Sequence, residues 1–271
     1  MSECTHDCST CSSNCADRKQ SFLQPMNKNS NIKKVIGIVS GKGGVGKSLV
    51  TSLLASKCAK AGLKVGILDA DITGPSIPKS FGVKSHAMQE NDELLPNVTE
   101  SGIKMMSINL LLEDENAPVV WRGPVISGVI HQFWTDVKWG ELDYLFVDMP
   151  PGTGDVALTV FQALPVDGIV IVSTPQDLVK MIVNKAFNMA QMMNIPVLGL
   201  VENMSYFKCP DCGKKHSIFG DSQIDETAKA LGVPVLAKLP LDPENAKLVD
   251  LGKVEEIDAE ELSDFVSVLK R

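Results

Sequence analysis

The segment Gly41-Lys42-Gly43-Gly44-Val45-Gly46-Lys47-Ser48 is the most informative stretch of the chain. It matches the pattern G-x-x-x-x-G-K-[ST] at every required position. The apolar run 35–39 precedes it, and the amphipathic stretch 47–61 follows it. Glycines in this pattern let successive backbone N–H groups face phosphate oxygens, and the N-terminus of the next helix adds a favourable dipole. The segment therefore predicts a phosphate-binding loop between a strand and a helix.

The polar residues of this loop have separate predicted roles in binding ATP with Mg²⁺. Lys47 supplies a point charge to the β- and γ-phosphates, and the Ser48 hydroxyl is a ligand for Mg²⁺. Leu49, the next residue, is counted with the nucleotide-binding segment.

The rest of the chain alternates short apolar runs with helix-length amphipathic stretches. The apolar runs are 35–39, 65–68, 103–110, 144–147, 168–172, 197–201 and 233–239. Helices are expected near 47–61, 124–137, 155–164, 176–193 and 221–231, with a final helix from Ile257, where Asp258 and Glu261 form a capping-box pattern. This alternation predicts an α/β fold with a doubly wound, mostly parallel sheet. We expect a cysteine-rich tail over residues 1–30 and one P-loop ATPase domain over residues 31–271.

Three carboxylates follow predicted strands and complete the expected nucleotide site. Asp69 and Asp71 follow the run 65–68, and Asp148 follows the run 144–147. Ligands of open α/β sheets gather at the carboxyl ends of the strands. We therefore expect Asp148 and Asp69 to hold Mg²⁺ and Asp71 to orient the attacking water. For Asp69 and Asp71 the alternative is a plain strand-end acid that caps a turn.

The charge balance and the hydropathy of the chain limit the classes of partner that we expect. The 271 residues include 26 basic and 33 acidic ones, a net charge of -7, which argues against a broad nucleic-acid-binding face. No apolar run approaches the ~18 residues that a transmembrane helix needs, and the N-terminus lacks the apolar region of a secretion signal. We expect a cytoplasmic protein that binds neither nucleic acid nor membrane.

The cysteines point to metal binding. Cys209-Pro-Asp-Cys212-Gly is a knuckle whose two sulfurs can bind one metal centre, and Lys208, Lys214 and Lys215 are expected to lower the thiol pKa values. A [4Fe–4S] cluster usually takes four thiolates, so two copies of the chain would supply one site. Zinc, with His216 nearby, fits the spacing equally well.

Four further cysteines, Cys4, Cys8, Cys11 and Cys15, lie within the first fifteen residues. They could hold a second [4Fe–4S] cluster or a zinc ion within one chain, or belong to a flexible tail.

Lys42 is an additional lysine, and with it the loop resembles the deviant Walker A motif of MinD/ParA-like ATPases. In those families this lysine reaches the nucleotide of a partner subunit. The resemblance implies an ATP-dependent homodimer in which Lys42 acts in catalysis together with Lys47. The alternative is a solvated loop lysine.

A closer resemblance rests on Trp121-Arg-Gly-Pro124, Trp139-Gly-Glu-Leu-Asp-Tyr144, Val147-Asp-Met-Pro-Pro-Gly-Thr-Gly-Asp155 and Val201-Glu-Asn-Met-Ser-Tyr-Phe207. These stretches are similar to the Mrp/ApbC family of iron–sulfur cluster carrier ATPases over residues 33 to 250. The resemblance implies a dimeric ATPase that takes a labile [4Fe–4S] cluster from assembly factors and delivers it to apo-proteins. It also implies that Asn203 contacts the adenine edge and that the loop Pro240, Leu241 and Asp242 lies against the base.

The N-terminal cysteines resemble the cysteine-rich extension of the eukaryotic cytosolic scaffolds related to this family, with shorter spacing. Two other functions share the loop motif. A positioning ATPase like MinD or ParA would act by surface binding, and a reductase component like the nitrogenase iron protein would pass electrons rather than clusters.

Overall fold

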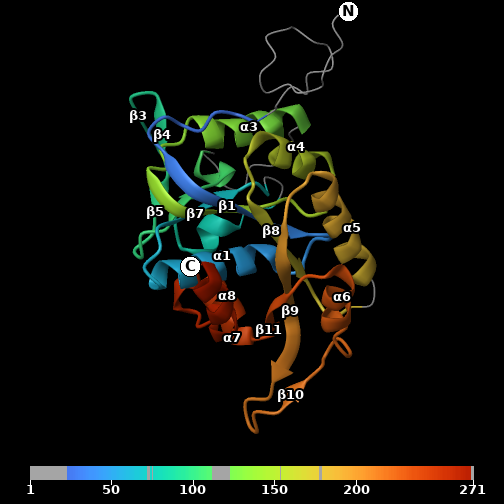
Figure 1. Cartoon of the computed structure of the whole chain (residues 1–271). Coiled ribbons are helices and arrows are strands. Elements are labelled where there is room, and N and C mark those ends of the chain that lie inside the picture. Colours follow the sequence, from blue (N-terminus) through green and yellow to red (C-terminus); the bar gives the residue numbers. More distant parts are fainter. Residues whose placement is uncertain are drawn as a thin grey trace, which may run out of the picture.

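A computed structural model describes residues 23–71, 74, 76–111, 123–152, 154–176 and 179–269. Its centre is a mostly parallel sheet in the order β10-β9-β8-β1-β7-β2-β6-β5, with β11 paired to β9 (Figure 1). The main strands are β1 (Asn31–Ser40), β2 (Val65–Asp69), β6 (Lys104–Met106), β7 (Glu141–Asp148), β8 (Gly168–Ser173), β9 (Val197–Lys208) and β11 (Val235–Pro240). The short strands β5 (Asn97–Val98) and β10 (Lys215–His216) pair antiparallel with β6 and β9.

Helices cover both faces of the sheet. One face carries α3 (Gly123–Thr135), α4 (Asp155–Ala163), α5 (Val179–Met192) and α6 (Ile224–Leu231). The other carries α1 (Lys47–Lys60), α2 (Ile77–Ser80), α8 (Ser263–Leu269) and the 3₁₀ turns η2 (Val254–Glu256) and η3 (Glu260–Leu262). Strand β1 explains this arrangement, because Val35 and Val39 pack on the first set while Ile36 and Ile38 pack on the second. A strand covered on both faces has no polar side, which is why these runs are continuously apolar.

The predicted α/β fold with a doubly wound, mostly parallel sheet is confirmed by this architecture. None of the helices in the described part of the chain is both long and apolar enough to cross a bilayer.

Two predicted elements are wrong in part. The apolar run 103–110 is a short strand, β6, followed by the 3₁₀ turn η1 (Ile108–Leu110). The chain leaves the sheet at Ser107, whose hydroxyl donates to Asp69 Oδ2 at 3.0 Å. The run 103–110 has no regular periodicity that separates these two conformations.

The final helix begins at Ser263 rather than at Ile257. Neither member of the predicted capping box caps it. Asp258 pairs with Lys57 Nζ at 2.9 Å, and Glu261 accepts a hydrogen bond from the Tyr206 hydroxyl at 3.0 Å.

The structure also contains elements that the sequence analysis did not anticipate. These are the hairpin of β3 (Met88–Glu90) and β4 (Glu93–Leu95), and helix α7 (Pro243–Asp250). Asp242 caps α7 by accepting from the Glu244 N–H at 2.9 Å, and Pro243 occupies the first turn, where no N–H is required.

Residues 24–30 directly precede β1 and therefore lie at the end of the sheet opposite the phosphate-binding loop, which follows β1. The Gln24 N–H donates to the Ala163 carbonyl at 3.0 Å, and the Trp134 indole donates to the Gln24 carbonyl at 3.0 Å. The described chain therefore contacts the domain from Gln24 onward. The division at residue 30 stays a prediction.

Candidate nucleotide and metal-binding site

The phosphate-binding loop connects β1 to α1 and is packed tightly from two sides. A Cβ atom on Gly41 would lie 1.8 Å from Ile182 Cγ2 of α5. Gly46 has φ +80°, and a Cβ there would lie 2.1 Å from Asn203 Nδ2 of β9. The loop can therefore follow this path only with glycine at both positions.

Asp148 is the centre of the polar network beneath the loop. It is fully buried and accepts hydrogen bonds from Lys47 Nζ at 2.8 Å, Ser48 Oγ at 2.6 Å and Thr51 Oγ1 at 2.8 Å. Thr51 lies one helical turn after Lys47 and was not predicted. Its i+4 spacing from the lysine could have identified it, because residues four apart share a helix face.

The Ser48 and Asp148 oxygens fit the Mg²⁺ prediction. Hydroxyl and carboxylate oxygens are the hard ligands that Mg²⁺ takes, and neighbouring ligands with bonds of 2.0–2.1 Å lie roughly 2.9 Å apart in an octahedron. The two oxygens here are 2.6 Å apart. A small adjustment would therefore let both reach one cation.

Asp69 and Asp71 complete the site from the end of β2. Asp69 pairs with Asp148 in the sheet register and is almost fully buried. Burial, reinforced by the nearby Asp148 carboxylate, raises the pKa of Asp69 well above its usual range. Asp71 Oδ2 lies 3.6 Å from Lys47 Nζ. The structure thus gathers all three predicted carboxylates around one buried lysine, and Ser107 supports Asp69 without any local sequence signal.

Lys42 extends away from this network. Its ammonium group donates to Gln176 Oε1, in the loop after β8, and its carbonyl accepts from Ser40 Oγ at 3.0 Å. The predicted contact of Lys42 with a partner's nucleotide is untested in a single chain. Gln176 was not predicted, because the pairing spans 134 residues.

A pocket of about 860 Å³ lies beside the loop and extends to the end of β9. All five residues predicted near the nucleotide outside the loop line it, namely Leu49, Asn203, Pro240, Leu241 and Asp242. Asn203 donates from Nδ2 to the Val45 carbonyl at 3.0 Å. An amide group has a second N–H and an acceptor oxygen, so Asn203 can hold the loop and a base together.

Beyond this pocket the end of β9 and β10 form a projecting arm, residues 207–216, that carries the cysteine knuckle (Figure 1). The knuckle is closed by two hydrogen bonds, from the Cys209 N–H to the Lys214 carbonyl at 2.9 Å and from the Gly213 N–H to the Cys209 carbonyl at 2.9 Å. Cys209 is half-buried and Cys212 is exposed, and both are free thiols.

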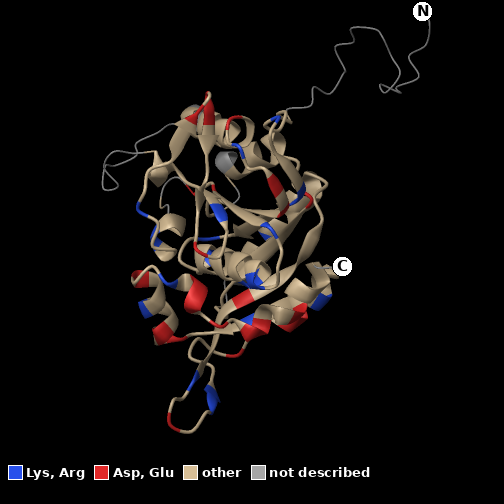
Figure 2. Cartoon of the chain, turned by 90° about the vertical axis from the view of Figure 1, so that its left-hand side faces the viewer, with Lys and Arg blue, Asp and Glu red and all other residues tan. Residues whose placement is uncertain are grey.

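The pKa of Cys209 is lowered, as predicted, but the predicted cause is wrong. The lowering comes from hydrogen bonds donated by the peptide N–H groups of Cys212 and Asp211 and from the Cys212 thiol. Lys215 Nζ instead lies 4.0 Å from the centre of the Tyr206 ring. The tight turn 209–213 directs peptide N–H groups at the Cys209 sulfur. The nearby lysines in the sequence had suggested a different cause. Residues 207–216 contain three lysines and one aspartate, and Figure 2 shows both colours on the projecting arm.

The four N-terminal cysteines, Cys4, Cys8, Cys11 and Cys15, lie outside the described residues.

The fold and the site together define an α/β P-loop nucleotide-binding protein. The comparisons with known proteins give its family. Residues 31–270 match the ParA family model described as NUBPL iron-transfer P-loop NTPase. The chain belongs to this family.

Its relatives have consistent names. A protein of Clostridium perfringens named iron-sulfur cluster carrier protein is 51% identical over 238 residues, covering 85% of this chain and 84% of that protein. One of the same name from Methanocaldococcus jannaschii is 47% identical and covers 100% of this chain and 97% of its own length.

Solved structures agree on the fold. A nucleotide-binding protein from Archaeoglobus fulgidus, in complex with ADP, is 47% identical, with a TM-score of 0.78 and coverage of 87% of this chain and 92% of its own. The MinC:MinD cell division complex of Aquifex aeolicus has a TM-score of 0.63 over 88% of this chain and 95% of its own, at 18% identity. That likeness shows the fold alone.

Proposed function

We propose that this chain is an ATP-hydrolysing carrier of iron–sulfur clusters, in which two copies share one [4Fe–4S] cluster through Cys209 and Cys212 of each. The observation that carries this proposal is the incomplete ligand set of the arm. Within the residues that the structure describes, no group of three or more His, Cys, Asp and Glu side chains is arranged to hold a metal. A cluster needs four thiolates, so a second copy of the knuckle is the natural source of the missing pair.

The same observation bears on zinc. His216 lies in β10, yet it does not join Cys209 and Cys212 in a potential three-ligand group of the described chain. A structural zinc site usually has four protein ligands. One chain's knuckle is therefore incomplete for zinc as it is for a cluster, and the carrier names of the relatives make zinc the weaker alternative.

The nucleotide site would supply the energy for this cycle. In the proposed reaction Lys47 binds the β- and γ-phosphates, Ser48 and Asp148 hold Mg²⁺ with Asp69 beside them, and Asp71 orients the attacking water. The second loop lysine, Lys42, would leave Gln176 to reach the nucleotide of the other copy. Burial of the lysine–carboxylate network strengthens these electrostatic effects relative to water.

The cluster is the cargo in this proposal, received from assembly factors and delivered to apo-proteins of the cytoplasm. The carrier names of relatives at 42–51% identity support it. The positioning ATPase and the electron-transferring reductase share only the loop and the fold, and we find no specific observation that favours either. The N-terminal cysteines are proposed to hold a second [4Fe–4S] cluster.

Anaerobic reconstitution tests the shared cluster. The four tail cysteines are first replaced by serine, so that all bound iron reports on the knuckle. In this background we expect about four iron and four sulfide ions per two chains, and none after Cys209→Ser/Cys212→Ser. Cys58→Ala is the matched control, because it removes a buried thiol far from the arm.

Iron, sulfide and zinc analysis, with Mössbauer spectra and the molar mass in solution, completes the test. Equal iron retention with and without Cys209 and Cys212 would refute the shared site. Zinc without iron, at one ion per chain or one ion per two chains, would refute the cluster.

A further inference from the structure

Strand β9 belongs both to the nucleotide pocket and to the cysteine arm. Asn203 contacts the phosphate-binding loop through the Val45 carbonyl, and Cys209 follows it by six residues. Asn203 and Cys209 both line the same pocket. A nucleotide in this pocket would therefore lie against the strand that carries the arm.

A β-bulge separates the two functions of β9. Lys238 of β11 pairs with Glu202, whereas Pro240 pairs with Tyr206. Three residues of β9 thus oppose one residue of β11. Met204, within the bulge, has φ +55°, a left-handed conformation that is uncommon for a residue other than glycine. A bulge bends its strand and re-aims the residues beyond it, so the direction of the arm is set at this point.

Tyr206 ties the base of the arm to the domain just after the bulge. Its hydroxyl donates to Glu261 Oε1 of η3 at 3.0 Å. Its carbonyl accepts from the Leu241 N–H at 2.7 Å, and Lys215 of β10 lies over its ring. Burial, together with the hydrogen bond to Glu261, raises the pKa of Tyr206 to about 12, so the hydroxyl remains a donor at neutral pH.

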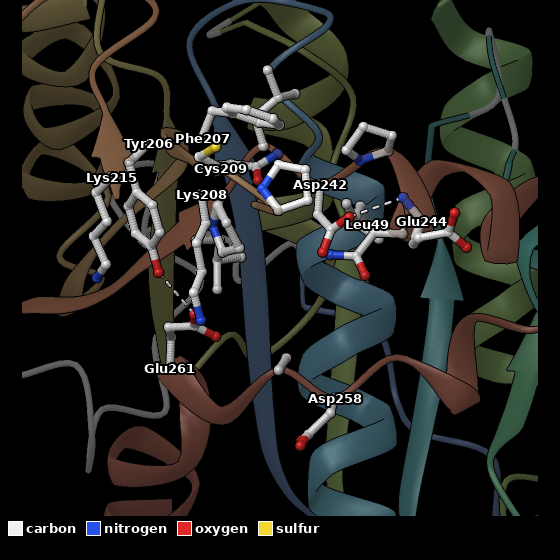
Figure 3. Close-up of a pocket in the computed structure, with 18 of the residues that line it drawn as sticks. Leu49, Tyr206, Phe207, Lys208, Cys209, Lys215, Asp242, Glu244, Asp258 and Glu261 are labelled. Atoms are coloured by element: carbon white, nitrogen blue, oxygen red, sulfur yellow. Dashed lines mark hydrogen bonds between the residues drawn. The ribbon is translucent and has the colours of Figure 1, made fainter. Parts of the chain in front are cut away.

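These contacts form one wall of the pocket. Tyr206, Lys215, Glu261 and Leu241 all line it. Figure 3 shows the Tyr206 hydroxyl directed at Glu261 with Lys215 beside the ring, while Leu49 and Asp242 lie on the opposite side.

We propose that Tyr206, held by Glu261 and Lys215, is a latch that fixes the arm relative to the nucleotide pocket and transmits nucleotide occupancy to Cys209. This proposal rests on the proposed function. In it Tyr206 is a positioning residue that couples the nucleotide pocket to the cluster-binding knuckle. A nucleotide packed against the wall that Leu241 and Tyr206 form stabilises the closed latch, which restricts the knuckle. A ligand shifts an equilibrium only through such differential contacts.

The test uses the full chain without a cluster. The rate of Cys209 alkylation by iodoacetamide is measured by fragment mass spectrometry, with and without a nonhydrolysable ATP analogue and Mg²⁺. In the wild type the nucleotide is expected to slow alkylation about fivefold, the change in an equilibrium that one hydrogen bond of ordinary net strength produces. Tyr206→Phe should alkylate equally fast with and without nucleotide, and its nucleotide affinity should fall by no more than the same fivefold, because coupling between the two equilibria is reciprocal.

Matched variants separate the latch from general loosening. Tyr144→Phe removes another part-buried tyrosine hydrogen bond, to the Leu269 carbonyl at 2.6 Å, and should respond to nucleotide like the wild type. Glu261→Ala removes the acceptor and should behave like Tyr206→Phe, whereas Glu261→Gln keeps an acceptor and should restore the response.

Several outcomes would overturn the latch. It fails if Tyr206→Phe responds to nucleotide as Tyr144→Phe does, or if the wild type binds nucleotide without any change in Cys209 alkylation. A wild type that binds no nucleotide would instead refute the nucleotide part of the proposed function. Because this readout needs no cluster, a failure to bind iron leaves it intact.

Discussion

Substituting Gly46 by alanine should lower the free energy of unfolding for two reasons, which comparison with Gly62→Ala separates. The first is backbone strain, because Gly46 has φ +80°. The second is steric, because the new Cβ would meet Asn203 Nδ2 at 2.1 Å. Gly62 has nearly the same φ, +85°, and nothing within 4 Å of its Cβ position. Gly62→Ala therefore measures the strain alone.

The two substitutions should differ by a predictable amount. A left-handed alanine costs roughly 1–2 kcal/mol, partly offset by the lower entropy of the unfolded chain. In Gly46→Ala the buried Asn203 amide must also move and lose its bond to the Val45 carbonyl, which costs about 1–3 kcal/mol more. For a chain of this size, that difference lowers the melting temperature by about 2–12 °C relative to Gly62→Ala.

Thermal and urea unfolding of the nucleotide-free protein measure both values. The added substitution Asn203→Ala provides an internal check, because it removes the group that the new methyl would strike. The extra loss in Gly46→Ala should therefore largely disappear in the double variant. Equal destabilisation by Gly46→Ala and Gly62→Ala, or additive effects of Gly46→Ala and Asn203→Ala, would show that contact with Asn203 is not the cause of the extra loss.

Three further substitutions test other parts of the structure. Asp148→Asn removes the charge shared by Lys47 and Ser48 and should slow Mg²⁺-dependent ATP hydrolysis by at least about 100-fold, measured as phosphate release; a rate within threefold of wild type would contradict the assignment. Lys42→Ala should leave ATP binding intact but abolish ATP-dependent dimerisation in analytical ultracentrifugation, and persistent dimers would rule out its role in trans. Burial raises the pKa of Cys58 to about 12, so between pH 9 and 12 the unfolded chain loses a proton that the folded protein keeps. The free energy of unfolding should then fall by up to ~1.4 kcal/mol per pH unit, and Cys58→Ala should lack this component.

The sequence was sufficient where the determining interactions are local. The loop pattern, the strand before it and the helix after it lie within 30 residues, from Asn31 to Lys60. The carboxylates were predictable because the ends of parallel strands meet at one edge of the sheet, as the pairing of Asp69 with Asp148 shows. Rules of this kind apply to any doubly wound sheet and need no knowledge of side-chain packing.

The remaining part of the site depends on contacts that no local pattern encodes. Asn203 reaches the loop across 158 residues, and Tyr206 meets Glu261 across 55. Glu261 is also where the prediction of a helix start was wrong. Its spacing from Asp258 matched a capping box. Both side chains instead bond to residues distant in the sequence, Asp258 to Lys57 and Glu261 to Tyr206. Local propensity is a weak prior when a buried polar group nearby requires a partner.

The polar network beneath the loop also explains how nucleotide binding can change the structure. Lys47 is only 5% exposed and is bound to Asp148 and Asp71, while Ser48 is bound to the same Asp148. The groups expected to bind phosphate and Mg²⁺ therefore satisfy one another in the protein alone. In the proposed site, binding of MgATP would replace these contacts, because Lys47 would turn toward the phosphates and Asp148 would accept a cation in exchange for the lysine. Asp148 is the last residue of β7, and Asp71 lies just after β2. The exchange of partners would therefore affect the loops that follow both strands. Without ligand, Lys47, Ser48, Asp71 and Asp148 bond to one another. ATP would replace these bonds with its own, and coupling of the nucleotide site to the arm requires such a difference in contacts between the two states.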